Sequence, residues 1–228
     1  PTDLLDNRFC PGYFGHIELV RPVILVQYLD MVLVFAKNFC LKCSALLALL
    51  TEDDVMLSEK YKGKTRLQFI SSKCSRSKMC PKCGALVPNK IIKEGILKIF
   101  AVYKDVGADQ ENDKIPLTPE FLVKMFKRIS NDDLVLMGLD SRWCRPEWFI
   151  CTVLPVPPPS VRPSVRQGNG QRSEDDMTHK LIDILKTNSQ IKKKIESETS
   201  LENTIDEWTS VLQYHVATYI DNNIPGVN

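Results

Sequence analysis

The sequence predicts an α+β fold in which packed helices and short antiparallel strands surround a metal-bound cysteine segment. Hydrophobic residues make up 43% of the 228-residue chain, which is enough for one or two folded domains. Apolar residues recur at helical spacing in several segments, and four of the 8 cysteines form two C-x-x-C pairs. Because 30 Lys and Arg oppose 28 Asp and Glu, the net charge of +2 indicates no partner until its distribution is considered.

No membrane helix or secretory signal is expected. The most apolar run, residues 23–36, is interrupted by Gln27 and Asp30 and is shorter than the roughly 20 residues that a bilayer span needs. The chain begins at Pro1 and has no basic segment followed by an apolar core and a cleavage site. We therefore expect an intracellular protein with reduced cysteines, and a piece of a larger chain.

The two C-x-x-C pairs predict one structural zinc site. Two-residue spacing lets both thiolates of a tight turn face one metal ion, and two such turns supply four sulfur ligands. Ser44 and Gly84 follow the pairs, and Gly84 can adopt the positive φ that such a turn requires. A thioredoxin-like redox pair and unpaired buried thiols are the alternatives. The expected ligands of the Zn²⁺ ion are Cys40, Cys43, Cys80 and Cys83.

We predict no chemical role for Cys74, Cys144 and Cys151. Cys74 lies six residues before Cys80 and could compete with it as a ligand, but the regular spacing favours Cys80. Cys144 and Cys151 lie among aromatic and aliphatic neighbours, where a cysteine is usually a small buried hydrophobe.

Charge is segregated along the chain. Residues 60–82 carry many lysines and arginines and no Asp or Glu. One interpretation is a solvated, flexible loop that is neutralised by acidic surface elsewhere, and the other is direct contact with phosphates. The candidate nucleic-acid contacts in this run are Lys73, Arg76 and Lys78.

Local patterns predict the elements of the second half. Thr118 and Pro119 begin a helix whose apolar stripe runs to Ile129. Residues 148–153 have strand character, residues 154–159 can only be extended polyproline-like chain, and residues 161–171 are a loop.

Two helices are expected at the carboxyl end. Carboxylates at 174–176 begin the first, whose apolar face is expected at Leu181, Ile182, Ile184 and Leu185. The second begins near Asn203 and stops before Pro225-Gly226, with a core stripe at Ile205, Trp208, Leu212, Val216, Tyr219 and Ile220. The polar stretch 196–202 would let them pack antiparallel.

Several motifs together closely resemble the amino-terminal clamp region of the largest subunit of eukaryotic RNA polymerase II. They occur in the same order as in that family, and the resemblance covers essentially the whole chain. The motifs are CPGYFGHIEL (10–19), the two C-x-x-C pairs, RPEW (145–148), TVLPVPPP (152–159), VRPS (161–164), EDDMT (174–178) and LQYHVATY (212–219).

The resemblance implies a polymerase clamp fold and a role for each part. Residues 1–145 would form the clamp head with its zinc-binding knuckles, 146–160 a strand and proline-rich connector, 161–179 a lid-like loop, and 180–228 a helical hairpin. A clamp closes over the DNA cleft and holds the template and the RNA:DNA hybrid. The lid helps to part RNA from DNA, and its candidate phosphate contacts here are Arg162, Arg166 and Arg172.

The resemblance also implies the setting of the parent protein. Its partners would be other polymerase subunits, the DNA template, the RNA:DNA hybrid and transcription factors. It would act in the nucleus of a cell, or in the host cytoplasm or virion if a large DNA virus encodes it. A free-standing zinc module that binds nucleic acid or protein, derived from a polymerase clamp, is the alternative.

Departures from the family pattern limit what is carried over. Of the family's first zinc site only Cys10 is evident, and Tyr13 stands at the histidine position, so we expect that site to be degenerate. Gln167 stands where the family often has an aromatic residue. No Asp-x-Asp-x-Asp motif is present, so the catalytic Mg²⁺ of the parent enzyme would lie outside this segment.

Overall fold

The chain divides into two compact units in a computed structural model that describes residues 10–95, 98–103, 113–166, 168, 172–197 and 201–224. The central unit is Ile24–Ile150. The terminal unit combines the segment up to Val23 with the segment from Cys151 onward. No helix of the described residues is long and apolar enough to cross a membrane.

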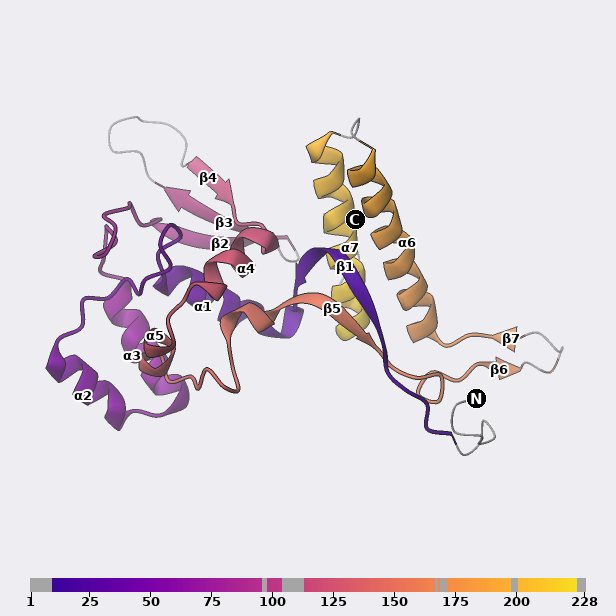
Figure 1. The fold of residues 1–228 in the computed structure, drawn as a ribbon, viewed down its shortest axis with the longest axis horizontal. Helices are drawn as coiled ribbons and strands as arrows, with labels where there is room; N and C mark the ends of the chain where they lie inside the picture. The colour runs from indigo at the N-terminus through magenta and orange to yellow at the C-terminus, as the bar shows by residue number, and fades with distance from the viewer. Residues whose placement is uncertain are drawn as a thin grey trace. The chain divides into compact units, whose positions relative to one another are not determined.

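Helices and one small sheet make up the central unit (Figure 1). Its sheet is antiparallel in the order β2-β3-β4, with Ile91 opposite Ala101. The elements in chain order are η1 (Val26–Tyr28), α1 (Leu29–Asn38), α2 (Glu52–Lys60), α3 (Gly63–Cys74), β2 (Lys90–Glu94), β3 (Lys98–Tyr103), β4 (Asp113–Pro116), α4 (Pro119–Lys127), α5 (Asn131–Leu136) and η2 (Pro146–Phe149).

Helix α1 is the centre of this unit's core, where it packs against α3, β2 and η2. Its Phe35 is fully buried and stacks on Phe39 with ring centroids 5.6 Å apart. Phe126 of α4 meets the Phe35 ring edge-on at 6.1 Å. Aromatic pairs in these geometries add to the stability that burial of the rings provides.

The predicted helix after Thr118 is confirmed. The Thr118 hydroxyl accepts a hydrogen bond from the Phe121 amide at 3.3 Å, as an N-cap should, and Leu122, Met125 and Phe126 are buried. In contrast, the loop interpretation of the basic run is wrong for residues 63–74, which form α3. Ile70 and Cys74, one helical turn apart, are buried on this helix.

The terminal unit contains a strand pair, a short hairpin and two long helices. Strand β1 pairs with β5, and β6 pairs with β7. Helices α6 and α7 lie side by side and antiparallel, as predicted (Figure 1). The bounds are β1 (Gly15–Ile24), β5 (Ile150–Val156), β6 (Val165–Arg166), β7 (Arg172–Ser173), α6 (Asp176–Glu196) and α7 (Glu202–Ile220).

Two expectations for residues 148–159 need correction. Trp148 lies in the 3-10 turn η2, because Pro146 begins that turn and the strand starts only at Ile150. Strand β5 then continues to Val156, so the first half of the predicted polyproline segment pairs with β1 instead.

The helical hairpin follows the predicted pattern with one error. Asp175 caps α6 by accepting a hydrogen bond from the Met177 amide at 2.8 Å. Leu181 and Ile184 are buried as expected, but Ile182 and Leu185 are 38% and 51% exposed. The buried stripe of α6 instead continues at Thr187 and Ile191, because α7 covers only one face of the helix.

Helix α7 begins close to the predicted residue. Ile205, Leu212 and Val216 are buried, which confirms the centre of its stripe, whereas Ile220 at its end is 37% exposed. The expected stop at Pro225-Gly226 lies outside the described residues.

Candidate metal centre and candidate nucleic-acid interface

The four predicted cysteine ligands meet at one point in the central unit. Their Sγ atoms all lie within 4.8 Å of one another, and they form the one group of possible metal ligands among the described residues. The Sγ atoms of Cys40 and Cys83 are 3.6 Å apart, and those of Cys43 and Cys80 are 3.5 Å apart. Each close pair therefore joins one C-x-x-C turn to the other.

These distances fit a tetrahedral zinc ion and no disulfide. Zinc–sulfur bonds of about 2.3 Å in a tetrahedron place the sulfurs about 3.8 Å apart. A disulfide would bring two sulfurs to about 2.05 Å. Four sulfur ligands complete the coordination sphere, so the site suits a structural ion without an open position for catalysis.

The two C-x-x-C turns have the same backbone hydrogen bonds. In the first, the Cys40 amide donates to the Ala45 carbonyl at 2.9 Å, and the Ser44 amide donates to the Cys40 carbonyl at 2.8 Å. In the second, Cys80 donates to Ala85 at 2.8 Å and Gly84 donates to Cys80 at 2.9 Å. We call residues 39–46 the first knuckle and residues 79–86 the second knuckle.

The knuckles are an internal repeat that the sequence prediction missed. The signal was available, since the segments read FCLKCSAL and MCPKCGAL and share both cysteines, the lysine between them and the final Ala-Leu. In each knuckle a single antiparallel β-bridge joins the first residue to the last, Phe39 to Leu46 in the first and Met79 to Leu86 in the second. The sequence prediction compared only the residues that follow each pair, Ser44 and Gly84, and did not extend to the shared lysine and Ala-Leu.

Burial and local hydrogen bonds shift the pKa values of these thiols in opposite directions. It raises the pKa of Cys40, and it raises the pKa of Cys43 to about 12. Burial also opposes the Cys80 thiolate, but hydrogen bonds from the Cys83 and Lys82 amides and from the Cys43 thiol outweigh it and lower the pKa of Cys80 to about 7. A divalent cation would compensate half of the charge of four thiolates in this site.

The remaining cysteines lie apart from this centre. Cys74, the predicted competitor, is 2% exposed in α3, and burial raises its pKa to about 12. Burial also raises the pKa of the Cys144 and Cys151 thiols, and the Cys151 thiol donates to the Val153 carbonyl at 3.3 Å. They are packing residues, as predicted.

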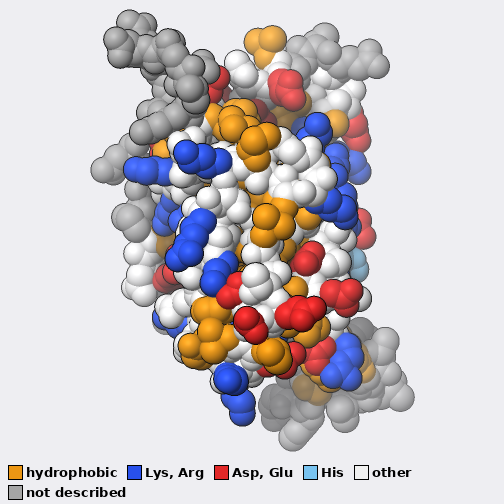
Figure 2. Space-filling model, turned by 90° about the vertical axis from the view of Figure 1, so that its left-hand side faces the viewer, with side chains coloured by type: hydrophobic (Ala, Val, Ile, Leu, Met, Phe, Trp, Pro, Cys, Tyr) orange, Lys and Arg blue, Asp and Glu red, His pale blue; other side chains and the backbone are white. Residues whose placement is uncertain are grey.

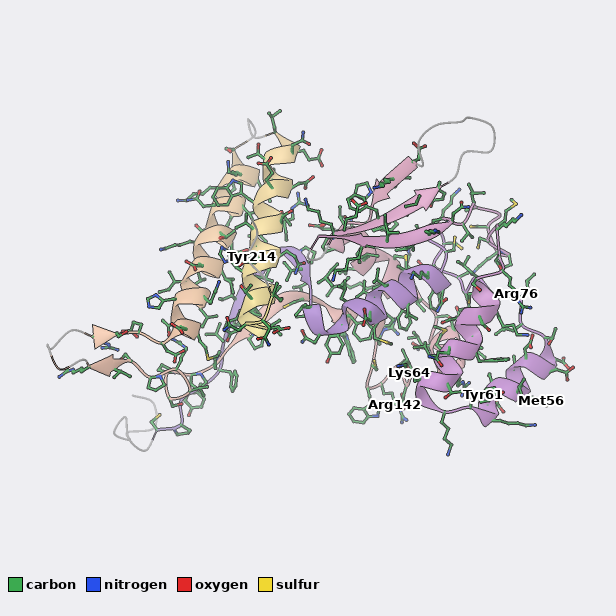
Figure 3. The ribbon with its side chains drawn as sticks, turned by 180° about the vertical axis from the view of Figure 1, so that it is seen from behind. Met56, Tyr61, Lys64, Arg76, Arg142 and Tyr214 are labelled. Carbon is green, nitrogen blue, oxygen red and sulfur yellow. The ribbon has the colours of Figure 1, made fainter. Side chains whose placement is uncertain are left out.

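The three basic candidates near the second knuckle differ in ion pairing and exposure. Lys73 of α3 is paired, because its Nζ lies 2.7 Å from Asp54 Oδ1 on α2 and 5.4 Å from the Phe69 ring centroid. Arg76 and Lys78 follow α3 and are exposed. Figure 2, which looks onto the side where α2 lies, shows basic side chains beside hydrophobic ones, with acidic side chains mainly in the lower half. Figure 3 labels Arg76 at the end of α3.

The three arginine candidates of the predicted lid also fall into two groups, one hydrogen-bonded within the chain and two exposed. Arg162 braces the root of the segment: its Nε donates to the Pro157 carbonyl at 3.0 Å and its Nη1 to the Thr178 hydroxyl at 3.2 Å. Arg166 and Arg172 are exposed and lie directly opposite each other on β6 and β7. The predicted loop thus contains a short hairpin, and Gln167 lies outside the described residues.

Comparison with known proteins decides the family. The family described as RNA polymerase Rpb1, domain 1, matches residues 2–228. This chain belongs to that family. Among its relatives is the DNA-directed RNA polymerase subunit Rpo1N of Sulfolobus acidocaldarius, 36% identical over 231 residues that cover 96% of this chain. The same subunit of Thermococcus celer is 37% identical over 229 residues, again 96% of the chain.

Membership of the Rpb1 domain 1 family confirms the predicted family at the level of the largest polymerase subunit. These two relatives are archaeal, so the RNA polymerase II type stays a prediction. The chain spans about a quarter of the length of these curated relatives, 25% and 24% respectively.

In this Rpb1 domain 1 chain, two of the motifs that carried the resemblance touch each other. The Ser160 hydroxyl donates to the Pro11 carbonyl at 2.6 Å, and Gly12 lies so close to Pro158 that a Cβ on it would be 2.7 Å from Pro158 Cβ. The expected loss of the first zinc site stays a prediction, because residues 1–9 lie outside the described part of the chain.

Proposed function

We propose that this chain is the amino-terminal clamp portion of the largest subunit of a DNA-directed RNA polymerase, a nucleotidyltransferase. The match of residues 2–228 to Rpb1 domain 1 carries this proposal. The clamp would close over the DNA cleft and hold the template and the RNA:DNA hybrid, together with other polymerase subunits and transcription factors. The catalytic Mg²⁺ of the parent enzyme would bind outside this segment.

The zinc centre would stabilise the clamp head by linking two of its helices. The first knuckle directly follows α1 and the second follows α3, so one ion held by both knuckles would join the carboxyl ends of both helices. Structural zinc contributes about 10–16 kcal/mol in small zinc peptides, well above the roughly 3 kcal/mol of closing the chain between the knuckles. The ion would therefore hold the basic surface beside the second knuckle in one position.

The β6-β7 hairpin would meet the phosphates of the nucleic acid. Arg166 and Arg172 face each other across the hairpin, and like charges directly opposite destabilise a strand pair. Glu174 offsets part of this repulsion, since its Oε1 lies 2.8 Å from Arg172 Nε. A phosphate that both guanidinium groups contact would remove the rest, which supports a role in holding or parting the hybrid.

Arg162 would act as a positioning residue instead. Its two hydrogen bonds join the proline-rich connector at Pro157 to the first turn of α6 at Thr178. These bonds hold together the two ends of the segment from which the hairpin projects. Replacing Arg162 would therefore affect where the hairpin lies more than the charge that it carries.

The test uses complete polymerase with the double substitution Arg166→Ala and Arg172→Ala. Displacement of the transcript from the template should be impaired while nucleotide addition stays largely intact. Arg142→Ala is the matched control, because Arg142, which is labelled in Figure 3, is an exposed arginine of the central unit. Its Nη2 lies 2.7 Å from Asp140 Oδ2. Normal transcript displacement in the double variant would refute the role given to the hairpin.

A further inference from the structure

The bridge residues of the two knuckles differ in exposure, although their backbones are equivalent. Phe39 and Leu46 of the first knuckle are 0% and 7% exposed. Met79 and Leu86, at the same positions of the second knuckle, are both 59% exposed. The second knuckle therefore presents to solvent an apolar pair that the first knuckle buries.

The first knuckle shows what kind of group covers such a pair. The Phe35 ring stacks on Phe39 with 5.6 Å between centroids and only 7° between the ring planes. Met79 and Leu86 have no such cover among the described residues, since each keeps 59% of its surface exposed. A large apolar side chain, best an aromatic one, would fit the exposed pair.

The surroundings of the exposed pair are basic. Residues 60–93 include no Asp or Glu. Lys78 precedes Met79, Lys82 lies inside the turn, and both are exposed. No ion pair of either lysine is found within the described part of the chain. An occupant with carboxylates beside its apolar side chain would complement this charge.

We propose that Met79 and Leu86 form a docking site for an acidic segment of a partner protein that places one aromatic side chain across the pair. A protein segment suits the site better than a nucleic acid. Bases bind by stacking on rings, and this pair offers a thioether and an aliphatic side chain, which adapt to apolar side chains. The proposal concerns a protein contact and does not depend on the proposed role of the arginine hairpin.

Oxidative footprinting of complete polymerase tests this site directly. The probe is a synthetic peptide with one phenylalanine flanked by glutamates, and mass spectrometry measures oxidation of each methionine. Met56 on α2, labelled in Figure 3, is the internal control. It has the same 59% exposure as Met79. The peptide should protect Met79 from oxidation several-fold and leave Met56 unchanged.

Two matched variants complete the test. Leu86→Ser should weaken peptide binding about tenfold by removing apolar contact area. Val135→Ser, at a residue 55% exposed on α5, should leave binding unchanged. Both variants should keep the zinc content of the unmodified polymerase, which would show that the knuckles remain folded.

Several results would overturn the proposal. Protection of Met79 in polymerase alone would mean that another part of the polymerase covers the pair. Equal protection by a peptide with alanine in place of phenylalanine would mean that charge alone is recognised. Equal protection by a single-stranded oligonucleotide would assign the site to nucleic acid, and no protection at all would remove it.

Discussion

Ser44 and Gly84 occupy the same position of the two knuckles, and both have a left-handed backbone, with φ of 59° and 67°. The position lies directly after the second cysteine, where the chain must turn beneath the metal site. Glycine adopts this conformation without strain, whereas serine carries a cost of about 1 kcal/mol. Ser44 is also 2% exposed, and its hydroxyl has no hydrogen-bond partner in the described structure.

Exchanging these residues should have opposite effects. Ser44→Gly should stabilise the chain by about 1 kcal/mol, because it relieves the backbone and removes a buried unpaired hydroxyl. Gly84→Ser should destabilise it by a similar amount. Denaturant unfolding of the zinc-loaded chain measures both. A loss of stability in Ser44→Gly would mean that the hydroxyl donates to a thiolate when metal is bound.

The metal content should be about one zinc per chain. Cys40→Ser and Cys80→Ser should lose it, and a strong chelator should unfold the knuckles of the intact chain. Cys74→Ser and Cys144→Ser are the matched controls, since neither thiol belongs to the cluster. Elemental analysis and circular dichroism give the readouts. Two ions per chain would show that a second site survives near Cys10, and loss of metal in Cys74→Ser would revive the competing ligand.

Asp54 should make the free energy of unfolding depend on pH in the acid range. The hydrogen bond from Lys73, followed by that from the Thr51 amide, lowers the pKa of Asp54. A carboxylate whose pKa is lower in the folded state stabilises the fold above its unfolded pKa of about 3.9, and that stability is lost as pH falls through the folded pKa. Asp54→Asn keeps the cap on Thr51 and should flatten the dependence of the unfolding midpoint on pH in the acid range.

Asp53→Asn is the control for this prediction, because Asp53 is an exposed carboxylate in the same helical turn. It shares the favourable interaction with the helix amino terminus and has no ion pair in the described structure. If both variants flattened the pH dependence equally, the helix amino terminus would be its cause, and the contact between Asp54 and Lys73 would not.

Gly12 should be intolerant of alanine. Its φ is +76° and an added Cβ would lie 2.7 Å from Pro158 Cβ, so backbone strain and overpacking add to about 2–5 kcal/mol. Gly95 has φ of +62° and no atom within 4 Å of such a Cβ, so Gly95→Ala should cost only about 1 kcal/mol. Comparable unfolding free energies for the two variants would show that the contact with Pro158 is loose.

Charge reversal near the second knuckle tests contact with DNA. Arg76→Glu in complete polymerase should weaken DNA retention and reduce its salt dependence by about one unit of slope. Lys73→Ala should leave the salt slope unchanged, because Asp54 already neutralises Lys73. Filter binding over a salt series measures the slopes. An unchanged slope in Arg76→Glu would favour a solvated basic surface without phosphate contacts.

Local spacing by itself determined the four-cysteine cluster, the cap at Thr118, the two carboxyl-terminal helices and the family. Such features depend on neighbours in sequence: two residues between cysteines define a turn, and a hydroxyl before a helix satisfies its free amides. The motifs in order were enough to identify the polymerase family without any contact being known.

Tertiary structure decided which residues of similar sequence segments are buried or ion-paired and which remain exposed. Phe39 and Met79 have matching local sequences, yet Phe39 is fully buried, beside the Phe35 ring that Phe126 of α4 also contacts, whereas Met79 is 59% exposed. Lys73 and Arg76 belong to the same basic run, yet Asp54, 19 residues earlier, pairs with only the first. Burial and ion pairing depend on segments distant in sequence, so only packing of the whole unit determines them.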